Sequence, residues 1–267
     1  MDYSKIERNI QKKLRDYCIN NDIKALVLGV SGGVDSAVVA ALAKPVCDNL
    51  NIKLYGRSIP ILTNKMDEIE RAQKIGRCFC HDFKEVDLGA MFHEFSREIE
   101  DEEGCLDDGR RDKIRQGNIK ARMRMIYLYN LAFIHRGMVL GTDNLTEYNL
   151  GFWTLHGDVG DYGMIQNLWK GEVYNLARHI VKKLNEKGKT QEVDALEDCI
   201  IATPTDGLGI TSSDLEQLEA RTYEEVDRIL QSSYITDNPI IKRHLNSEFK
   251  RHNPYNISRS DLLNEQT

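Results

Sequence analysis

A pair of neighbouring glycines, flanked by serines, is the first stretch of this sequence whose residue types could bind a ligand. The segment Ser31-Gly32-Gly33-Val34-Asp35-Ser36 follows an apolar run at 25–30 and precedes a helix-forming run at 37–43. Glycine lets backbone N–H groups turn toward a ligand, and the start of a helix attracts negative charge, so we expect phosphate there. On the glycines alone, an ordinary strand-to-helix turn capped by Ser or Asp is an alternative.

Asp35 in this turn is an acceptor that suits phosphate only if a divalent cation lies between the two, which indicates ATP with magnesium. A second acid, Glu147, follows the short apolar strand expected at 137–142, which ends in Thr142. The carboxyl ends of parallel strands meet at one edge of a sheet, so Asp35 and Glu147 could hold one magnesium ion as a pair. Helix capping or solvation of each acid by itself is the alternative.

Three cations, Lys120, Arg122 and Arg124, stand at the expected start of a long helix at 118–135. Cations at a helix start oppose the helix dipole, so a bound anion would explain them better than helix stabilisation does. Ordinary solvated basic residues are the alternative.

The stretch at 151–161 is rich in glycine, aromatic and acidic residues, which predicts a loop. Within it, Phe152 and Trp153 offer stacking faces for a base or a pyridine ring.

The 267 residues are 41% hydrophobic and 29% charged, with a net charge of −6, which is typical of a soluble globular protein and argues against a nucleic-acid partner. The first residues lack the apolar core of a signal peptide, and no apolar run approaches the roughly 20 residues of a membrane span. We therefore expect a cytoplasmic protein without a membrane contact. Of the six cysteines only Cys78 and Cys80 are close, which favours buried reduced thiols over a zinc site.

Apolar strands alternate with helices along the first half of the chain. This alternation predicts an α/β fold, with a doubly wound, mainly parallel five-stranded sheet flanked by helices in a single domain over residues 1–267. Such sheets bind ligands at the carboxyl ends of their strands, where the glycine turn lies. We expect strands at 25–30, 52–60, 83–88 and 137–142, and helices at 3–20, 64–80, 118–135, 170–185, from 190 to 198, 213–231 and 238–249.

The remaining segments have weaker patterns. A charged connection is expected at 101–117, a loop at 203–209, and a loose end over the last dozen residues. The long helix carries an apolar stripe expected to face the core, made of Ala121, Met125, Leu128 and Ala132.

The glycine turn resembles the SGGxDS loop of the N-type ATP pyrophosphatases, which include GMP, asparagine, argininosuccinate and NAD synthetases. Further motifs distinguish these families. Their order and spacing resemble those of ammonia-dependent NAD synthetases over roughly residues 5–255. These motifs are Gly117-Asn118-x-Lys120-Ala121-Arg122-x-Arg124-Met125, Leu140-Gly141-Thr142-Asp143-Asn144-x-x-Glu147, Gly157-Asp158 and Pro204-Thr205.

The resemblance implies a reaction of two steps in one site. ATP adenylates the nicotinate carboxylate of deamido-NAD and releases pyrophosphate, and ammonia then displaces AMP to give NAD. It implies catalytic roles for Asp35, Glu147 and Lys170, with Asp35 and Glu147 also on magnesium. The residues expected to bind ATP are Gly29, Val30, Ser31, Gly32, Gly33, Val34, Asp35, Ser36, Thr142, Lys170 and Thr205. Lys170 would neutralise phosphate.

The second half of the implied site would bind deamido-NAD. Phe152 and Trp153 are our candidates for stacking on the nicotinate ring, and the pair Lys250-Arg251, followed by Pro254, resembles a basic tail that folds over the dinucleotide. The positions expected on this substrate are Arg122, Phe152, Trp153, Leu155, Asp161 and Lys250. The family forms homodimers with the dinucleotide site at the interface, and the apolar stripe within 118–135 could provide that surface.

The chain departs from the family pattern at several positions. Leu155, followed by His156, stands where many relatives have a lysine that would touch the dinucleotide. The segment 182–201 is longer than the usual link, and 212–216 lacks the expected Asp-Glu pair.

Two other functions would use the same glycine turn. Another ATP pyrophosphatase, such as a tRNA-modifying or purine-amidating ligase, is one, although the tRNA enzymes usually bring a basic surface or a cysteine cluster. A non-catalytic adenine-nucleotide sensor is the other, although it would not need both Asp35 and Glu147. For a synthetase, ammonia from solution or from a separate partner, and not glutamine, is the expected nitrogen donor.

Overall fold

The computed structural model describes residues 1–99, 109–204, 213–232 and 237–263. In this part of the chain five strands form one sheet in the order β3-β2-β1-β4-β5, and every neighbouring pair is parallel. The α/β fold with a parallel five-stranded sheet is therefore confirmed. The strands are β1 (Ala25–Gly29), β2 (Lys53–Ser58), β3 (Asp82–Glu85), β4 (Met138–Gly141) and β5 (Tyr162–Gly163).

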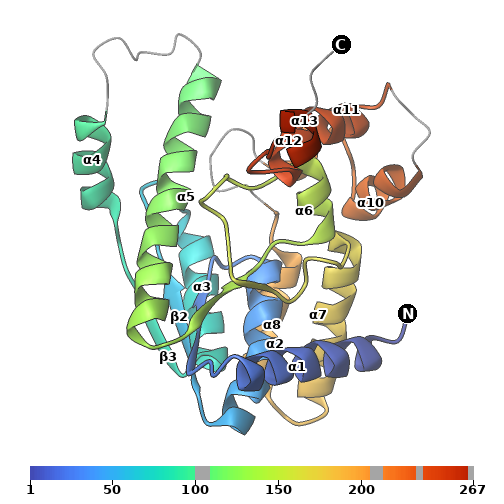
Figure 1. Ribbon diagram of the computed structural model, residues 1–267. Helices are drawn as coiled ribbons and strands as arrows, with labels where there is room; N and C mark the ends of the chain where they lie inside the picture. The colour runs from blue at the N-terminus through green and yellow to red at the C-terminus, as the bar shows by residue number, and fades with distance from the viewer. Residues whose placement is uncertain (100–108, 205–212, 233–236, 264–267) are drawn as a thin grey trace.

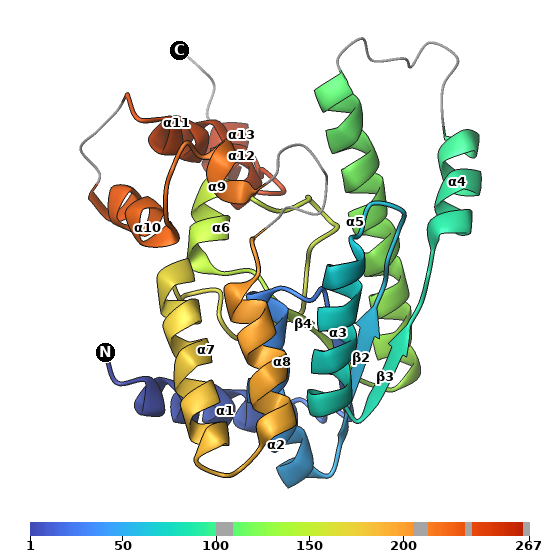
Figure 2. The ribbon, with the colours of Figure 1, turned by 180° about the vertical axis from the view of Figure 1, so that it is seen from behind.

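Helices cover both faces of this sheet. On one face α2 (Val34–Leu50) and α3 (Met66–Phe79) lie against the strands, and α1 (Tyr3–Asn20), α7 (Lys170–Asn185) and α8 (Thr190–Ile201) pack on α2. On the other face α5 (Gly109–Ile134) contacts β1 and β4, with α4 (Gly89–Glu98) beside it. Figure 1 shows α4 and α5, and Figure 2, from behind, shows α3, α7 and α8.

The central strand β1 is apolar along its length because both of its faces are covered. Leu26 and Leu28 belong to the large core cluster that contains most of α2, whereas Val27 packs with Ala132 of α5 and Val139 of β4. This alternation follows from the two-residue period of a strand. It leaves the end of β1, and the glycine turn after it, at the carboxyl edge of the sheet.

A third group of short helices lies over this carboxyl edge, at the top of Figure 1. Contacts join α6 to α7, α10 and α11, and α10 to α7. This group therefore borders the site expected from the sequence. Its members are α6 (Leu145–Leu150), α9 (Asp214–Gln217), α10 (Tyr223–Ser232), α11 (Pro239–Asn246), α12 (Glu248–Arg251) and α13 (Arg259–Leu263).

The long helix α5 begins at Gly109, so the segment 109–117 is helical and not part of a connection. Lys120 and Arg124 accordingly lie inside the helix, and the argument from the helix dipole for a bound anion is wrong. The ammonium of Lys120 is buried over the ring of Phe92, and Arg124 donates to the carbonyl of Ile59 at 2.9 Å.

Other boundaries also differ from the sequence-based expectations. The helix expected at 213–231 is divided into α9 and α10, and the helix at 238–249 into α11 and α12. The two-residue strand β5 and the helix α6 carry no strong periodic signal, and α13 lies in a stretch expected to be loose. The stretch 101–108 of the expected connection, and most of the loop at 203–209, lie outside the described residues.

Within the described ranges, no helix has the length and apolar character that crossing a bilayer requires.

Candidate active site

A cavity of about 600 Å³ opens at the carboxyl edge of the sheet. The ends of β1, β2 and β4 form its floor, and the helices α6 and α7 contribute one wall. The residues from Gly29 to Ser36, together with Thr142, Glu147, Lys170, Phe152, Trp153 and Lys250, all line it. Thr205 lies outside the described residues.

The glycine turn has a fixed shape that depends on Gly32. This residue has φ +83°, and a Cβ built on it would lie 2.2 Å from the carbonyl oxygen of Glu68 on α3. Arg71 of α3 also donates to the carbonyl of Gly32 at 3.0 Å. No residue other than glycine fits this position without a shift of α3.

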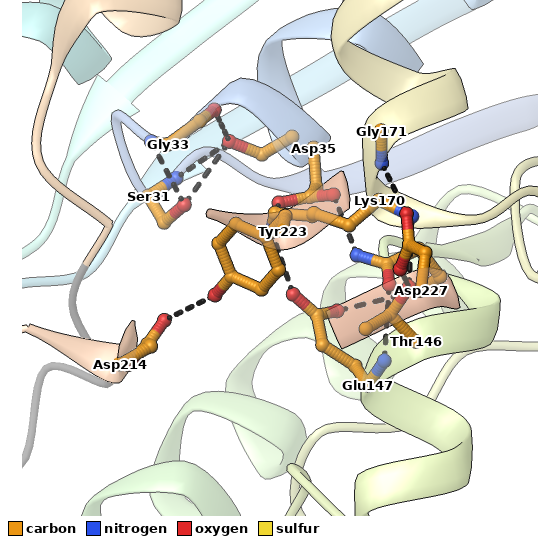
Figure 3. Close-up of polar contacts among 12 residues, drawn as sticks. Ser31, Gly33, Asp35, Thr146, Glu147, Lys170, Gly171, Asp214, Tyr223 and Asp227 are labelled. Carbon is orange, nitrogen blue, oxygen red and sulfur yellow. Dashed lines mark hydrogen bonds and ion pairs between the residues drawn. The ribbon is translucent and has the colours of Figure 1, made fainter. Parts of the chain in front are cut away.

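The serine hydroxyls stabilise the turn from within. Ser36 Oγ accepts from the N–H of Ser31 at 3.2 Å and donates to the carbonyl of Gly33 at 3.1 Å, and Ser31 Oγ accepts from the N–H of Gly33 at 3.3 Å. Figure 3 shows these contacts beside Asp35. Helix α2 starts at Val34, and its N-cap Gly33 has no side chain to cap it. The positive end of α2 therefore faces the cavity, as an anion site requires.

Lys170 brings the two predicted acids together. Its Nζ lies 2.5 Å from Oδ2 of Asp35 and 2.8 Å from Oε1 of Glu147, and its side chain is only 4% exposed. As the first residue of α7, this cation sits at the unfavourable end of the helix dipole, and the two carboxylates compensate for that. Lys170 was expected to neutralise phosphate, but in this structure its ammonium contacts the carboxylates.

A capping box places Glu147. Asn144 is the N-cap of α6: its Oδ1 accepts from the N–H of Glu147 at 3.0 Å, and Glu147 Oε2 accepts from the N–H of Asn144 at 3.3 Å. The same Asn144 side chain donates to Oδ1 of Asp35 at 2.8 Å. The side-chain amide of Asn144 thus contacts both acids, and it holds Asp35 and Glu147 close to each other.

The electrostatics of this cluster favour an added cation. Burial raises the pKa of Glu147 to about 7, although the ammonium of Lys170 acts against this. Burial, and then the charges of Glu147, Asp158 and Asp35, raises the pKa of Asp143 well above its ordinary value. Burial lowers the pKa of Lys170, but the two carboxylates outweigh it and raise that pKa well above the ordinary value. A single ammonium therefore serves several carboxyl groups.

The donor set fits magnesium that arrives with phosphate. Mg²⁺ in nucleotide sites is held by one or two carboxylates, waters and phosphate oxygens, and not by an all-protein cage. Asp35 and Glu147 are such a pair, and the described residues contain no group of three acidic, histidine or cysteine side chains that could hold a metal by themselves.

The aromatic loop at 151–161 also contributes residues to the lining of the cavity. Trp153 stacks on Tyr148 with ring centroids 5.5 Å apart, and the guanidinium of Arg243 lies 3.9 Å over the ring of Phe152. Each ring has one face occupied by a protein partner. Stacking of the nicotinate ring on Phe152 or Trp153 stays a prediction.

The C-terminal helices hold the end of α6. Lys250 Nζ donates to the carbonyls of Gly151 at 2.7 Å and Trp153 at 2.5 Å, while Arg243 and Arg251 donate to the carbonyls of Leu150 and Asn149. The last carbonyls of a helix lack partners inside it, so these cations satisfy them. Burial lowers the pKa of Lys250, and the charge of Arg243 adds to this.

Three predicted substrate residues lie outside the lining of the cavity, as far as the described residues show it. Arg122 is exposed and donates through Nε to the carbonyl of Leu155 at 3.2 Å. The carboxylate of Asp161 accepts from the N–H of Val139 at 2.8 Å, beside β4. Arg122, Leu155 and Asp161 are therefore not brought to the site formed by Asp35, Glu147 and Lys170, and their contact with deamido-NAD stays a prediction.

A sequence model of the family described as NAD synthase matches residues 6–261. The chain belongs to the NAD synthase family. It is 31% identical over 266 residues to an NH(3)-dependent NAD(+) synthetase of Thermoplasma volcanium, and the match covers 96% of this chain and 98% of the relative.

Two solved structures show the same fold. An NMN synthetase from Francisella tularensis superimposes with a TM-score of 0.78 at 24% identity, over 94% of this chain and 96% of the other. An NH3-dependent NAD synthetase from Campylobacter jejuni gives 0.67 at 23% identity, over 97% and 100%. At these identities the likeness supports the NAD synthase fold alone.

Sequence reasoning missed several residues of this NAD synthase site. The capping residue Asn144 carried a usable signal, because an N-cap residue with Glu three positions later is typical of a helix start. Arg243 and Asp227, which contact Phe152 and Thr146, carry no local signal, since their partners lie far away in the sequence.

Proposed function

We propose that this protein is an ammonia-dependent NAD synthetase that forms the nicotinamide group from the carboxylate of deamido-NAD, ATP and ammonia. The observation that carries the proposal is the meeting of Asp35, Glu147 and Lys170 beside the glycine turn, in a chain of the NAD synthase family. A carboxylate is a poor acyl donor, so it must first be activated.

Activation transfers AMP to the substrate. A carboxylate oxygen attacks the α-phosphorus of ATP, and the bond from that phosphorus to the oxygen bridging it to the β-phosphorus breaks. Backbone N–H groups of the glycine turn and the N-terminus of α2 stabilise the charge that develops on pyrophosphate. Lys170 supplies a buried cation at the same edge, and its ammonium would contact phosphate once the two acids have another partner.

Asp35 and Glu147 would hold magnesium. The ion would supply positive charge to the phosphate oxygens during departure of pyrophosphate. Since the folded protein raises the pKa of Glu147 to about 7, an added cation would also keep this carboxylate ionised at neutral pH.

In the second step the ammonia nitrogen attacks the acyl carbon, the bond from that carbon to the AMP oxygen breaks, and the nitrogen loses a proton. Phe152, Trp153 and Lys250 also line the cavity, and the nicotinate end of the substrate would lie beside them. Arg122, Asp161 and the segment around Leu155 would contact the rest of the dinucleotide.

A second candidate is the same amidation on the mononucleotide. Leu155 stands where the family resemblance implies a cation on the dinucleotide, and this favours testing a substrate that lacks the adenylate half. One of the solved structures with the same fold is an NMN synthetase.

We propose a homodimer that works in the cytoplasm, where ATP is made available. The stripe expected to face the core does so at Ala132, which packs with Val27 and Val139, whereas Ala121, Met125 and Leu128 line the cavity. The interface would therefore use the opposite face of α5, where Ile126, Phe133 and Ile134 are 61%, 87% and 62% exposed. Apolar side chains this exposed on one helix are typical of a protein interface.

Purified protein with ATP, magnesium, ammonium and deamido-NAD should form NAD, AMP and pyrophosphate in equal amounts. Replacing deamido-NAD by nicotinate mononucleotide tests the second candidate, and replacing ammonium by glutamine should abolish most product. If neither deamido-NAD nor nicotinate mononucleotide supports ATP–pyrophosphate exchange, both candidate functions are refuted.

A further inference from the structure

We propose that Asp227, on α10, is a positioning residue for the reaction, because its carboxylate fixes the helix that carries Glu147 to the helix that begins at Lys170. The inference rests on the proposed function only in the roles it gives to Glu147 and Lys170. Asp227 itself does not line the described cavity, so it acts through its neighbours.

The contacts form a closed, buried network of three helices. Thr146 Oγ1 of α6 lies 2.5 Å from Oδ1 of Asp227 and accepts from the N–H of Lys170 at 2.8 Å. Oδ2 of Asp227 accepts from the N–H of Gly171 at 2.9 Å. Thr146, Lys170 and Asp227 are 0%, 3% and 6% exposed, so water cannot replace these bonds without opening the structure. Figure 3 shows the network beside Lys170 and Glu147.

The donor and the acceptor of each hydrogen bond follow from the chemistry of the groups involved. The hydroxyl of Thr146 accepts from a backbone N–H, so its own hydrogen must go to Asp227. Both oxygens of Asp227 therefore accept, one from Thr146 and one from Gly171. An asparagine could keep the bond from the N–H of Gly171, but its NH₂ group would then face Thr146 Oγ1, and the hydroxyl hydrogen of Thr146 would lose its acceptor.

The network fixes the backbone at Lys170 and next to Glu147. Thr146 precedes Glu147 on α6, and the backbone N–H groups held by Thr146 and Asp227 are the first two of α7. A shift of α7 along its axis would carry Lys170 away from Asp35 and Glu147. The negative charge of Asp227 at the positive end of α7 also opposes such a shift.

A second contact from α10 supports the same arrangement. The ammonium of Lys170 lies 5.3 Å from the ring centroid of Tyr223, and the hydroxyl of Tyr223 donates to Asp214 at 3.0 Å. The helix α10 thus contacts Lys170 both at its backbone, through Asp227 and Thr146, and at its side chain, through Tyr223.

The experiment compares Thr146→Val, which removes the hydroxyl, with Thr146→Ser, which keeps it, and adds Asp227→Asn. We expect Thr146→Val and Asp227→Asn to lower kcat and ATP–pyrophosphate exchange by about 10–100-fold, as loss of a supporting hydrogen bond at a site does. The KM for deamido-NAD should change less than about twofold, since none of the hydrogen bonds of the network involves the aromatic loop. Thr146→Ser should restore most of the activity.

Glu7→Gln is the matched control. Glu7 is also a carboxylate that is 6% exposed and bonded to α7, but through Lys183 and His179, far from Lys170. It should lose stability in chemical unfolding and keep its kcat. Loss of kcat in Glu7→Gln to the same degree, or equal activity of Thr146→Val and Thr146→Ser, would overturn the inference.

Failure of the proposed function is distinguishable from failure of this inference. If the wild type forms no product from either acid, the proposed function is wrong. If the wild type is active and Asp227→Asn folds with an unchanged kcat, the positioning role is wrong while the function stands. Should Asp227→Asn not fold, the comparison of the two Thr146 variants decides.

Discussion

The Nζ of Lys170 lies 2.8 Å from Oε1 of Glu147, so the cation that begins α7 meets the acid that caps the start of α6. A second carboxylate, that of Asp35, meets the same ammonium from the glycine turn. The charge of Lys170 thus links the segments that follow β1 and β4, and the predictions for Lys170 and Glu147 depend on this contact.

Lys170→Met should lower kcat by about 10²–10³-fold, because the variant loses a preorganised cation beside the departing pyrophosphate. The assay is release of pyrophosphate under saturating ATP. Lys182→Met, at the exposed end of the same helix, should remain within about twofold of the wild type. Equal activity of the two variants would remove Lys170 from the site.

Glu147→Gln should change how stability depends on pH. The folded state raises the pKa of Glu147 from its ordinary value of 4.5 to about 7, so it holds the proton more tightly than the unfolded chain does. The contribution of this group to the free energy of unfolding is therefore largest below 4.5 and falls as the pH rises through 7.

Glutamine cannot ionise, so the Glu147→Gln variant should gain stability relative to the wild type between about pH 5 and about pH 7.5. Urea unfolding without nucleotide at the two values measures this. The pKa of Asp143 shifts in the same direction, and the charge of Glu147 contributes to that shift, so the difference between the two proteins reports Glu147 together with its effect on Asp143. A constant difference at both values would contradict the assignment.

Gly32→Ala should weaken both folding and ATP binding, because the new Cβ would clash with the carbonyl of Glu68 at 2.2 Å. Gly188→Ala is the control, since Gly188 has φ +68° but nothing within 4 Å of a Cβ. The control should cost about 1–2 kcal/mol of unfolding free energy from backbone strain alone. Gly32→Ala should lower the unfolding free energy by more than this and should raise the KM for ATP. An equal loss of unfolding free energy in the two variants would mean that α3 shifts at little energetic cost.

Phe133→Glu should dissociate the proposed dimer, because it places a charge on the exposed apolar face of α5. Sedimentation velocity at micromolar concentration checks this. Met66→Glu, at a methionine that is 70% exposed on α3, serves as the control and should leave the assembly unchanged. A wild type that sediments as a monomer would end the dimer proposal.

Leu155→Lys should shift preference toward the dinucleotide. A lysine ammonium that reaches a phosphate gains a charge-assisted hydrogen bond, which is typically worth a factor of about ten or more in kcat/KM. The measured quantity is the ratio of kcat/KM for deamido-NAD and for nicotinate mononucleotide. An unchanged ratio would show that position 155 does not face the substrate.

The meeting of Asp35 and Glu147 could be anticipated because strand periodicity locates the ends of β1 and β4, and parallel strands end at one edge. Lys170 was expected at the site from the family resemblance alone, and on phosphate, whereas its ammonium contacts the two carboxylates. The contacts of Arg122 with Leu155 and of Asp161 with Val139 could not, since they depend on how a loop returns to the sheet. The type of a side chain indicates what the residue can bind, but not which partner the fold brings next to it.

The start of α5 and the short strand β5 were missed for a related reason. The residues 109–117 are mostly charged, and a charged helical turn has no apolar stripe to reveal it. The strand β5 has only two residues, Tyr162 and Gly163, so its identity comes from pairing with β4 and not from its own sequence.

The cations that satisfy the end of α6 also constrain the order in which parts of the chain can complete their folding during synthesis. Asn149 and Gly151 receive their hydrogen bonds from Arg251 and Lys250, about a hundred residues later along the chain. Until the ribosome has added Lys250 and Arg251, the carbonyls at the end of α6 lack these donors and can bind water in their place. The nascent chain can fold its sheet early, but its catalytic edge becomes complete only when residues 243–251 have left the ribosome.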